Sequence, residues 1–283
     1  MSALFVKHLT VLDFSYVHPE RGILGESWIV DVELHGDLDD QGMVFDFGHV
    51  KRQVRDAVES LFDHKLVVPK SLPGLQVQRQ GDQLDLQWQD LAGRKFHHLS
   101  PSEGVELVDA VDVTPDTLVD QLQQTALAAL PSNVKKVVIE LRTEDISGAF
   151  YHYSHGLKKH DGNCQRIAHG HRSRLKILRN GKRDPLLEKA WALKWKDIYI
   201  GTRADLIRQF SDHGVDYCHF GYDARQGRFE LTLPAAHVYL IDTDSTVEYL
   251  ADHIVTSLKH DDPEHDFEVR AFEGVMKGAL ARR

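Results

Sequence analysis

Three histidines and one cysteine lie close together in the second half of the chain, with a spacing that suits a metal ion. His169 and His171 are two residues apart. Side chains two apart on a β-strand point to the same face, so these two imidazoles would project side by side. His155, on a neighbouring predicted strand, would complete a site of three nitrogens. Three protein ligands and an open fourth position are typical of catalytic zinc.

Cys164 precedes this strand, close enough in sequence to reach the open position. A second interpretation is a closed structural zinc site in which Cys164 is the fourth ligand. Chance clustering is a third, because the chain contains 18 histidines. The ordered pattern of His155, Cys164 and the pair His169 and His171 favours metal binding over chance. It also favours the open catalytic site over the closed one.

The composition predicts a soluble protein of two domains. The chain has 283 residues, 42% hydrophobic and 27% charged, as in ordinary globular proteins. A formal charge of −9 argues against a non-specific nucleic-acid partner, which needs a basic face. Two cysteines cannot form a disulfide framework, so we expect a cytoplasmic protein. A charged residue, Lys7, interrupts the apolar N-terminal stretch too early for a signal peptide. No apolar run is long enough to cross a membrane.

An internal repeat is predicted from similar segments that occur in the same order in both halves. Phe14–His18 is similar to Tyr151–His155, and Phe62–His64 is similar to Ser211–His213. The repeat predicts two units, residues 1–147 and 148–283. Each unit is expected to contain antiparallel strands, two helices and a hairpin.

Local signals place the parts of each predicted unit. Thr114 and Ser245 are expected to be helix N-caps, because their hydroxyls can accept a hydrogen bond from the first helical turn. The elements expected in the two units are helices at Asp116–Leu130 and Val247–Leu258, hairpins at Gln78–Leu86 and Tyr222–Leu231, and closing strands at Lys136–Arg142 and Asp266–Phe272.

With these motifs the chain resembles the family of 6-pyruvoyl-tetrahydropterin and 6-carboxy-tetrahydropterin synthases, duplicated in tandem. The second half carries its zinc and cysteine motif. The first half carries its helix-start motif at Gly42–Lys51 and its Asp-His pair, but Leu24-Gly25-Glu26 replaces His-Gly-His. The resemblance assigns the zinc ligands to His155, His169 and His171, the catalytic cysteine to Cys164, and an unused first-ligand position to His18.

The resemblance implies an α+β fold of two tunnelling-fold units, whose sheets assemble into an oligomeric barrel, and hence a homo-oligomer. It implies a small-molecule pterin substrate, namely dihydroneopterin triphosphate or a related dihydropterin, and triphosphate elimination or side-chain cleavage. Zinc would act as a Lewis acid and the Cys164 thiolate as the base. Glu273 and Glu144 match the residue that anchors the pterin, since a carboxylate can accept two hydrogen bonds from its N–H edge.

Two Asp-His pairs are candidates for proton transfer, Asp63-His64 and Asp212-His213. The first half keeps a pair without a metal, and the second keeps a metal beside a segment that has diverged. We therefore expect a composite site in which Asp63 and His64 serve Cys164. The simpler alternative is that His64 only stabilises the end of the helix that begins near Asp46.

Two other functions are compatible with the same motifs. One is a non-catalytic pterin- or purine-binding module with a structural zinc, and the other is a zinc-stabilised oligomeric scaffold. Arg172, Arg174 and Lys176 alternate with the ligands along the strand, so we expect them to face away from the metal and to be solvated. Cys218 matches no functional position and is expected to be buried.

Overall fold

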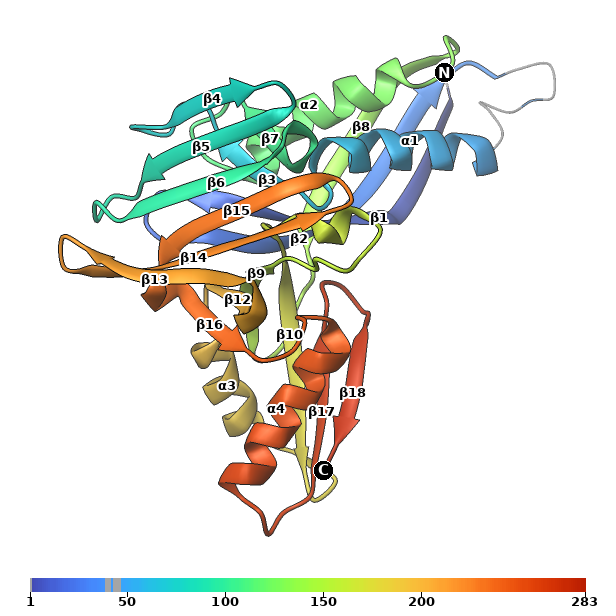
Figure 1. The fold of residues 1–283 in the computed structure, drawn as a ribbon. Coiled ribbons are helices and arrows are strands. Elements are labelled where there is room, and N and C mark those ends of the chain that lie inside the picture. Colours follow the sequence, from blue (N-terminus) through green and yellow to red (C-terminus); the bar gives the residue numbers. More distant parts are fainter. Residues whose placement is uncertain (1, 39–41, 43–46) are drawn as a thin grey trace.

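Two units of α+β structure lie one above the other (Figure 1). The computed structural model describes residues 2–38, 42 and 47–283. The first unit consists of β1 (Ser2–His18), β2 (Gly22–Gly36), α1 (Phe47–Phe62), β3 (Leu66–Pro69), β4 (Gln76–Gln80), β5 (Gln83–Gln89), β6 (Lys95–Pro101), β7 (Val105–Val108), α2 (Pro115–Ala128) and β8 (Val134–Thr143).

The second unit repeats this order and adds two strands. It consists of β9 (Phe150–His155), β10 (His169–Arg179), β11 (Lys182–Arg183), α3 (Pro185–Lys194), β12 (Ile198–Thr202), β13 (Leu206–Asp212), β14 (Val215–Ala224), β15 (Gly227–Pro234), β16 (Val238–Ile241), α4 (Val247–Asp261), β17 (Phe267–Phe272) and β18 (Gly278–Arg282).

Three sheets organise the molecule. The first unit has the order β7-β3-β1-β2-β8, and the second has β16-β12-β9-β10-β17-β18 with β11 beside β10. The hairpins of both units join in a third sheet, β13-β14-β15-β6-β5-β4, through pairing of β15 with β6. The third sheet therefore ties the two units together, and in Figure 1 it lies to the left of α1 and above α3 and α4.

The helices are amphipathic and cover one face of each main sheet. In α1 the buried residues Val50, Val54, Val58 and Phe62 recur every four positions and pack on β1 and β2. This spacing places an apolar stripe along one side of a helix. No described helix is long and apolar enough to cross a bilayer.

The predicted helices, hairpins and closing strands are present, and one cap differs. The Thr114 hydroxyl accepts a hydrogen bond from Thr117 N–H and caps α2, as predicted. The cap of α4 is Thr246, not Ser245. Within the predicted helix-start motif, Gly42–Lys51, residues 43–46 lie outside the described residues.

The two units approach each other closely at two glycines. A Cβ on Gly25 of β2 would lie 1.8 Å from the carbonyl oxygen of Tyr153 in β9. A Cβ on Gly170 of β10 would lie 2.7 Å from the Cα atom of Gly25. Any side chain at either position would separate the strands, so glycine is required here. Next to this contact, the Oγ atoms of Ser15 and Ser154 are 2.7 Å apart.

This contact fixes which residues of the two units correspond. Ser15 pairs with Gly25, and Ser154 pairs with Gly170. The next pair inward is Tyr16 with Leu24 in the first unit and His155 with His169 in the second. Tyr16 therefore has the register of the first predicted ligand. The prediction that His18 matches that ligand is wrong by two residues.

The parallel strands lead to a second correction. Ser15 pairs with Leu66 of β3, two residues after His64, and Ser154 pairs with Tyr199 of β12, two residues after Asp197. His64 and Asp197 also share left-handed backbone angles, with φ of 55° and 57°. The structural counterpart of His64 is thus Asp197. The parallel drawn from the sequence between Phe62–His64 and Ser211–His213 is wrong, because similar residue types occur there by coincidence.

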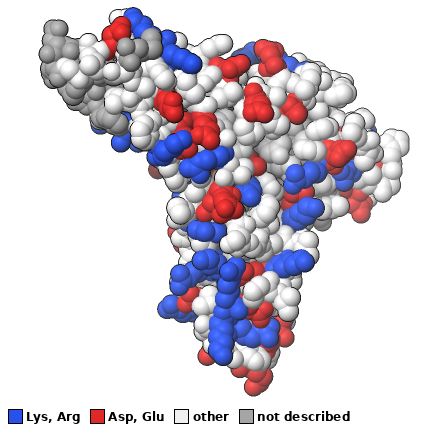
Figure 2. Space-filling view, turned by 180° about the vertical axis from the view of Figure 1, so that it is seen from behind, with Lys and Arg blue, Asp and Glu red and all other residues white. Residues whose placement is uncertain are grey.

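Charged side chains are distributed unevenly on the face seen in Figure 2. Both signs occur over the upper part, whereas Lys and Arg gather over the lower part, which the second unit forms. Arg270 and Arg282 on β17 and β18 both pair with Glu268, at 2.8 and 2.7 Å. Part of this positive charge is therefore neutralised within the sheet.

Candidate metal centre and active site

Three imidazole rings meet where the second unit crosses the first, and we call His155, His169 and His171 the candidate metal centre. His155 ends β9 and pairs with His169 at the start of β10. His171 follows on the same face of β10. The ring centroids are 4.4 to 5.8 Å apart, and one ligand atom from each ring lies within 4.8 Å of the others. Strand pairing and alternation thus bring the three rings together.

An oxygen atom lies beside the Nδ1 atom of each ring. Such partners fix the tautomer and direct Nε2 of a histidine toward a metal. The three contacts are His155 with Ser245 Oγ at 3.0 Å, His169 with the Arg166 carbonyl at 2.9 Å, and His171 with Asp13 Oδ1 at 3.2 Å.

The Nε2 atoms are left for a ligand. Those of His155 and His171 are buried and have no hydrogen-bond partner. Burial lowers the pKa of His155 and of His169 well below the ordinary value of 6.5, so both rings are neutral at pH 7. Neutral imidazole is the form that binds a metal. Buried polar atoms without partners and neutral rings fit the zinc ion that the sequence implies.

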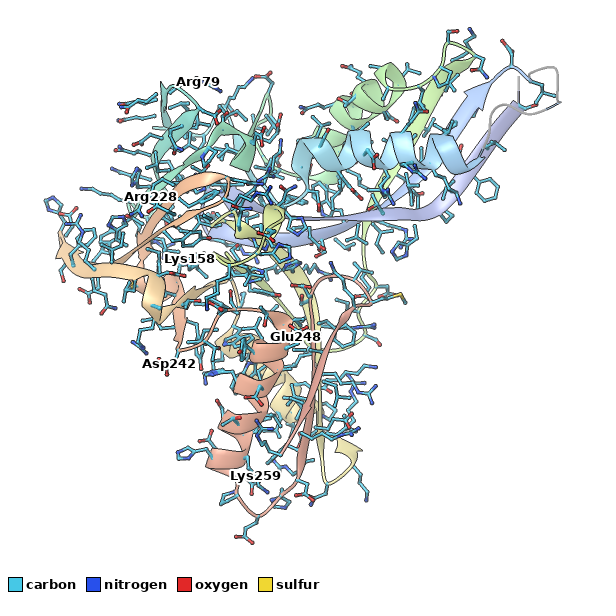
Figure 3. All side chains as sticks on the ribbon, turned by 45° about the vertical axis from the view of Figure 1, so that its right-hand side comes forward. Arg79, Lys158, Arg228, Asp242, Glu248 and Lys259 are labelled. Atoms are coloured by element: carbon cyan, nitrogen blue, oxygen red, sulfur yellow. The ribbon has the colours of Figure 1, made fainter. Side chains whose placement is uncertain are left out.

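Cys164 lies on a loop held against the candidate metal centre. Its carbonyl accepts a hydrogen bond from Leu157 N–H at 2.8 Å, which closes the loop. Figure 3 places Lys158 of this loop between Arg228 of the third sheet and Glu248 of α4. Among the described residues, the Cys164 sulfur forms a close group with His64 and His169, but not with all three centre histidines. This arrangement suits an open fourth position better than a closed site.

The Asp-His pair of the first unit reaches this cysteine. His64 Nδ1 lies 2.7 Å from Asp63 Oδ2, and its ring centroid is 5.1 Å from that of His169. Burial by itself would lower the pKa of His64, but hydrogen bonds with Asp63 and Cys164 outweigh it and raise the pKa to about 10. Asp63, His64 and Cys164 therefore come together within one chain, although they belong to different units.

The other Asp-His pair lies elsewhere. Asp212 ends β13, and His213 begins the turn to β14. The His213 side chain is 87% exposed, and Asp212 forms an ion pair with Lys95 at 2.6 Å. The chain does not bring these two side chains to the candidate metal centre.

The two glutamates occupy corresponding strand ends but different surroundings. Glu273 follows β17. Burial raises the pKa of Tyr153 and the charge of Glu273 adds to this rise, and the Tyr153 ring centroid is 5.3 Å from that of His171. Glu144 follows β8, is 8% exposed, and lies 3.3 Å from Arg174. Glu273 is thus near the candidate metal centre, whereas Glu144 is engaged by an arginine.

The expectation that the alternating basic residues of β10 are solvated is wrong for two of them. The Arg172 guanidinium lies 4.2 Å from the centre of the Phe150 ring and donates to the Glu144 carbonyl. Arg174 lies 4.3 Å from the Phe272 ring. Cys218 is 1% exposed in the core, as predicted.

The first unit has different residues at the corresponding positions, and we call this set the counterpart site. Its members are Tyr16, Leu24 and Glu26, in the register of the candidate metal centre, with His152 and Asp197 beside them. Arg21 binds Asp197 through two nitrogens, at 2.8 and 2.5 Å. The His152 ring contacts the Gly25 carbonyl at 2.7 Å. The polar groups of the counterpart site are thus paired with other groups of the protein. In the candidate metal centre, by contrast, ring nitrogens have no partner.

Sequence reasoning missed two residues that contact the centre. Ser245 was predicted only as a helix cap, and Asp13 was not singled out. Both contacts depend on the crossing of segments far apart in the chain. Asp13 lies directly before the Phe14–His18 segment, but nothing in its own surroundings indicates a contact with the other unit.

Comparisons with known proteins agree with these features. The family model described as 6-pyruvoyl tetrahydropterin synthase matches residues 7–103 and 147–274. A putative 6-carboxy-5,6,7,8-tetrahydropterin synthase of Pyrococcus horikoshii is 28% identical over 130 residues, which are 46% of this chain and 74% of that protein.

Solved structures of two synthases are also similar. The 6-pyruvoyl tetrahydropterin synthase of Plasmodium vivax has a TM-score of 0.38 and 15% identity, over 50% of this chain and 97% of that one. The Plasmodium falciparum 6-pyruvoyl tetrahydropterin synthase has a TM-score of 0.40 and 12% identity, over 50% of this chain and 90% of that one.

Proposed function

We propose that this chain, which belongs to the 6-pyruvoyl tetrahydropterin synthase family through two tandem matches, is a zinc-dependent lyase acting on a dihydropterin. The substrate class is dihydroneopterin triphosphate or a related dihydropterin, and the reaction is triphosphate elimination or side-chain cleavage. The observation that carries the proposal is the convergence of three imidazoles beside a cysteine that contacts an Asp-paired histidine.

His155, His169 and His171 would hold the zinc ion through their Nε2 atoms. When bound, zinc supplies a Lewis acid that polarises oxygens of the substrate side chain. The rings of His155 and His169 are held by hydrogen bonds on Nδ1, which would fix the position of the zinc ion relative to the substrate. The three rings are each at most 1% exposed, so the proposed metal position is shielded from bulk water.

Cys164 is proposed as the base that removes a carbon-bound proton. A ring nitrogen of His64 lies within 4.8 Å of its sulfur and can exchange the proton with it. Asp63 stabilises the imidazolium form of His64 and fixes the orientation of its ring. Glu273 is the proposed acceptor for the amino and ring N–H edge of the pterin, a role that Glu144 does not share because Arg174 engages it.

The direct test is turnover by the zinc-loaded protein. Incubation with dihydroneopterin triphosphate is expected to release inorganic triphosphate or to shorten the pterin side chain, as measured by chromatography. Cys164→Ala is expected to keep zinc and fold but to lose turnover. Cys218→Ala is the matched control, since this cysteine lies in the core away from the rings, and it should remain active.

Two results would contradict the proposal. If the zinc-loaded protein binds dihydropterins without changing them, the chain is a binding module. If Cys164→Ala loses zinc and stability together, Cys164 is a structural ligand, because such zinc contributes directly to folding.

A further inference from the structure

A buried carboxylate of the first unit lies against a ring of the candidate metal centre. Asp13 of β1 is 2% exposed. Its Oδ1 atom is 3.2 Å from His171 Nδ1 and accepts a hydrogen bond from Ser27 Oγ at 2.5 Å. Its Oδ2 atom is 3.1 Å from Lys277 Nζ. A buried carboxylate is costly unless it is paired, and Asp13 has a partner on each oxygen.

The surroundings of Asp13 are those of a carboxylate. Its two oxygens face a lysine ammonium, a serine hydroxyl and a ring nitrogen, each of which can donate a hydrogen bond. A negative charge beside Nδ1 favours the ring form in which Nδ1 carries the hydrogen. Nε2 then presents its lone pair to the metal position.

The backbone of Asp13 holds the proton-transfer pair as well. Its N–H donates to Asp63 Oδ1 at 3.0 Å, and its carbonyl accepts from His64 N–H at 2.7 Å. His64 has a left-handed φ of 55°, which is uncommon for a non-glycine residue, and these two hydrogen bonds support it. One residue of β1 thus contacts both a candidate metal ligand and the pair that reaches Cys164.

We propose that Asp13 is a positioning residue of the metal centre, through which the first unit orients His171 for metal binding. The inference rests on the proposed function only for the presence of the metal. No residue of the second unit makes this contact to His171 among the described ion pairs, so the metal centre is completed by the other half of the chain.

The test is metal binding in the absence of substrate. Apoprotein variants compete for zinc with a chromogenic chelator, and cobalt(II) reports ligand geometry through its visible spectrum. Asp13→Ala is expected to weaken zinc binding by about 10- to 100-fold, the usual effect of losing such a partner. Asp13→Asn keeps an acceptor oxygen but loses the charge, so its loss is expected to be smaller. Both should change the cobalt spectrum.

Asp31 provides the matched control. It lies on β2, four residues beyond Ser27, is 3% exposed, and pairs with Arg142 at 3.0 Å. Asp31→Asn therefore removes an equally buried and paired charge from the same sheet. We expect it to change stability but to leave zinc affinity and the cobalt spectrum as in the unaltered protein.

The outcomes separate this inference from the proposed function. Unchanged zinc affinity and cobalt spectra in both Asp13 variants would overturn it, as would an equal loss in Asp31→Asn. If Asp13→Ala does not fold, Asp13→Asn decides by the same criteria. Unaltered protein that binds zinc but has no turnover contradicts the proposed lyase alone, whereas protein that binds no zinc contradicts both.

Discussion

The candidate metal centre and the counterpart site occupy the same backbone frame but have opposite chemistry. His155, His169 and His171 correspond in register to Tyr16, Leu24 and Glu26. The first set offers ring nitrogens without partners, and the second offers a phenol, an aliphatic side chain and one carboxyl group. The frame alone therefore does not make a metal site, because two of the three counterpart positions lack a good zinc ligand.

The residues around the two sites also differ in charge. Asp13 lies beside His171 in the metal centre, whereas His152 lies 3.9 Å from Glu26 in the counterpart site, so acid and base have exchanged places. Asp197 stands where His64 stands and binds Arg21. The counterpart site is thus an internally paired contact between the units. The comparison indicates that each half has kept different parts of one composite site.

Metal content gives the largest expected difference between the two sites. We expect one zinc per chain, and His169→Ala should abolish binding because it removes one of three ligands. Glu26→Gln changes the residue of the counterpart site that corresponds to His171, and it should leave one zinc per chain. Elemental analysis of dialysed protein measures both. Two zincs per chain, or none after zinc supplementation, would contradict the comparison.

Turnover gives the second difference. His64→Ala is expected to lower kcat by about a hundredfold or more, the usual scale for a lost proton-transfer group, with zinc content unchanged. Asp197→Asn, at the corresponding turn, and His213→Ala, at an exposed hairpin, should retain most activity. Steady-state kinetics with each variant tests this order. If His213→Ala is the inactive variant, the assignment of the pair is wrong.

The pH dependence of stability reports on the counterpart site. Burial raises the pKa of Glu26 to about 7, from an ordinary value of 4.5. The unfolded chain therefore loses this proton more readily, and the contribution of Glu26 to stability is lost as the pH rises from about 4.5 through 7. Glu26→Gln should remove this loss and stabilise the protein at pH 8 by roughly 3 kcal/mol at most, with little effect at pH 4.

Urea unfolding at several pH values measures this effect. Asp31→Asn is a useful comparison because the pKa of Asp31 is lowered rather than raised, mainly by its hydrogen bonds to Arg142, His8 N–H and Lys7 acting against burial. Its removal should therefore cost stability at neutral pH, the opposite sign to Glu26→Gln. Equal behaviour of the two variants would mean that Glu26 is ionised without penalty.

The sequence predicted what is local and repeated. Alternation placed His169 and His171 on one face, and the hydroxyl before Pro115 located the start of α2. These features depend on neighbouring residues alone. The contact between His64 and Cys164 was also predicted. That prediction rested on each half carrying motifs that the other half lacks, and not on any pattern that indicates a contact.

The sequence did not reveal which residue of one half corresponds to which residue of the other. His18 and Asp212-His213 were aligned by residue type, whereas the backbone pairs Tyr16 and Asp197 with the functional positions. Similar residue types can be offset by two positions from the strand pairing, and the crossing at Gly25 and Gly170 is what reveals the offset here. Asp13 was missed for the same reason, since its contact exists only across the two units.

The smallest expected effect concerns the ion pair that replaces the proton-transfer group. Arg21 and Asp197 form two hydrogen bonds, and the Asp197 side chain is only 12% exposed. A bidentate, half-buried pair is expected to couple by about 1 kcal/mol, more than an ordinary surface pair. A double-mutant cycle with Arg21→Ala and Asp197→Ala measures this coupling through the free energy of unfolding.

The pair Lys70 and Asp109 is the control for that cycle. Its nitrogen and oxygen are 2.9 Å apart, but the side chains are 49% and 84% exposed, so solvent weakens their attraction. We expect coupling below about 0.5 kcal/mol there. If the Arg21 cycle gives no more coupling than this control, the counterpart site does not hold the units together. Arg21 would then occupy this position without stabilising the contact between the units.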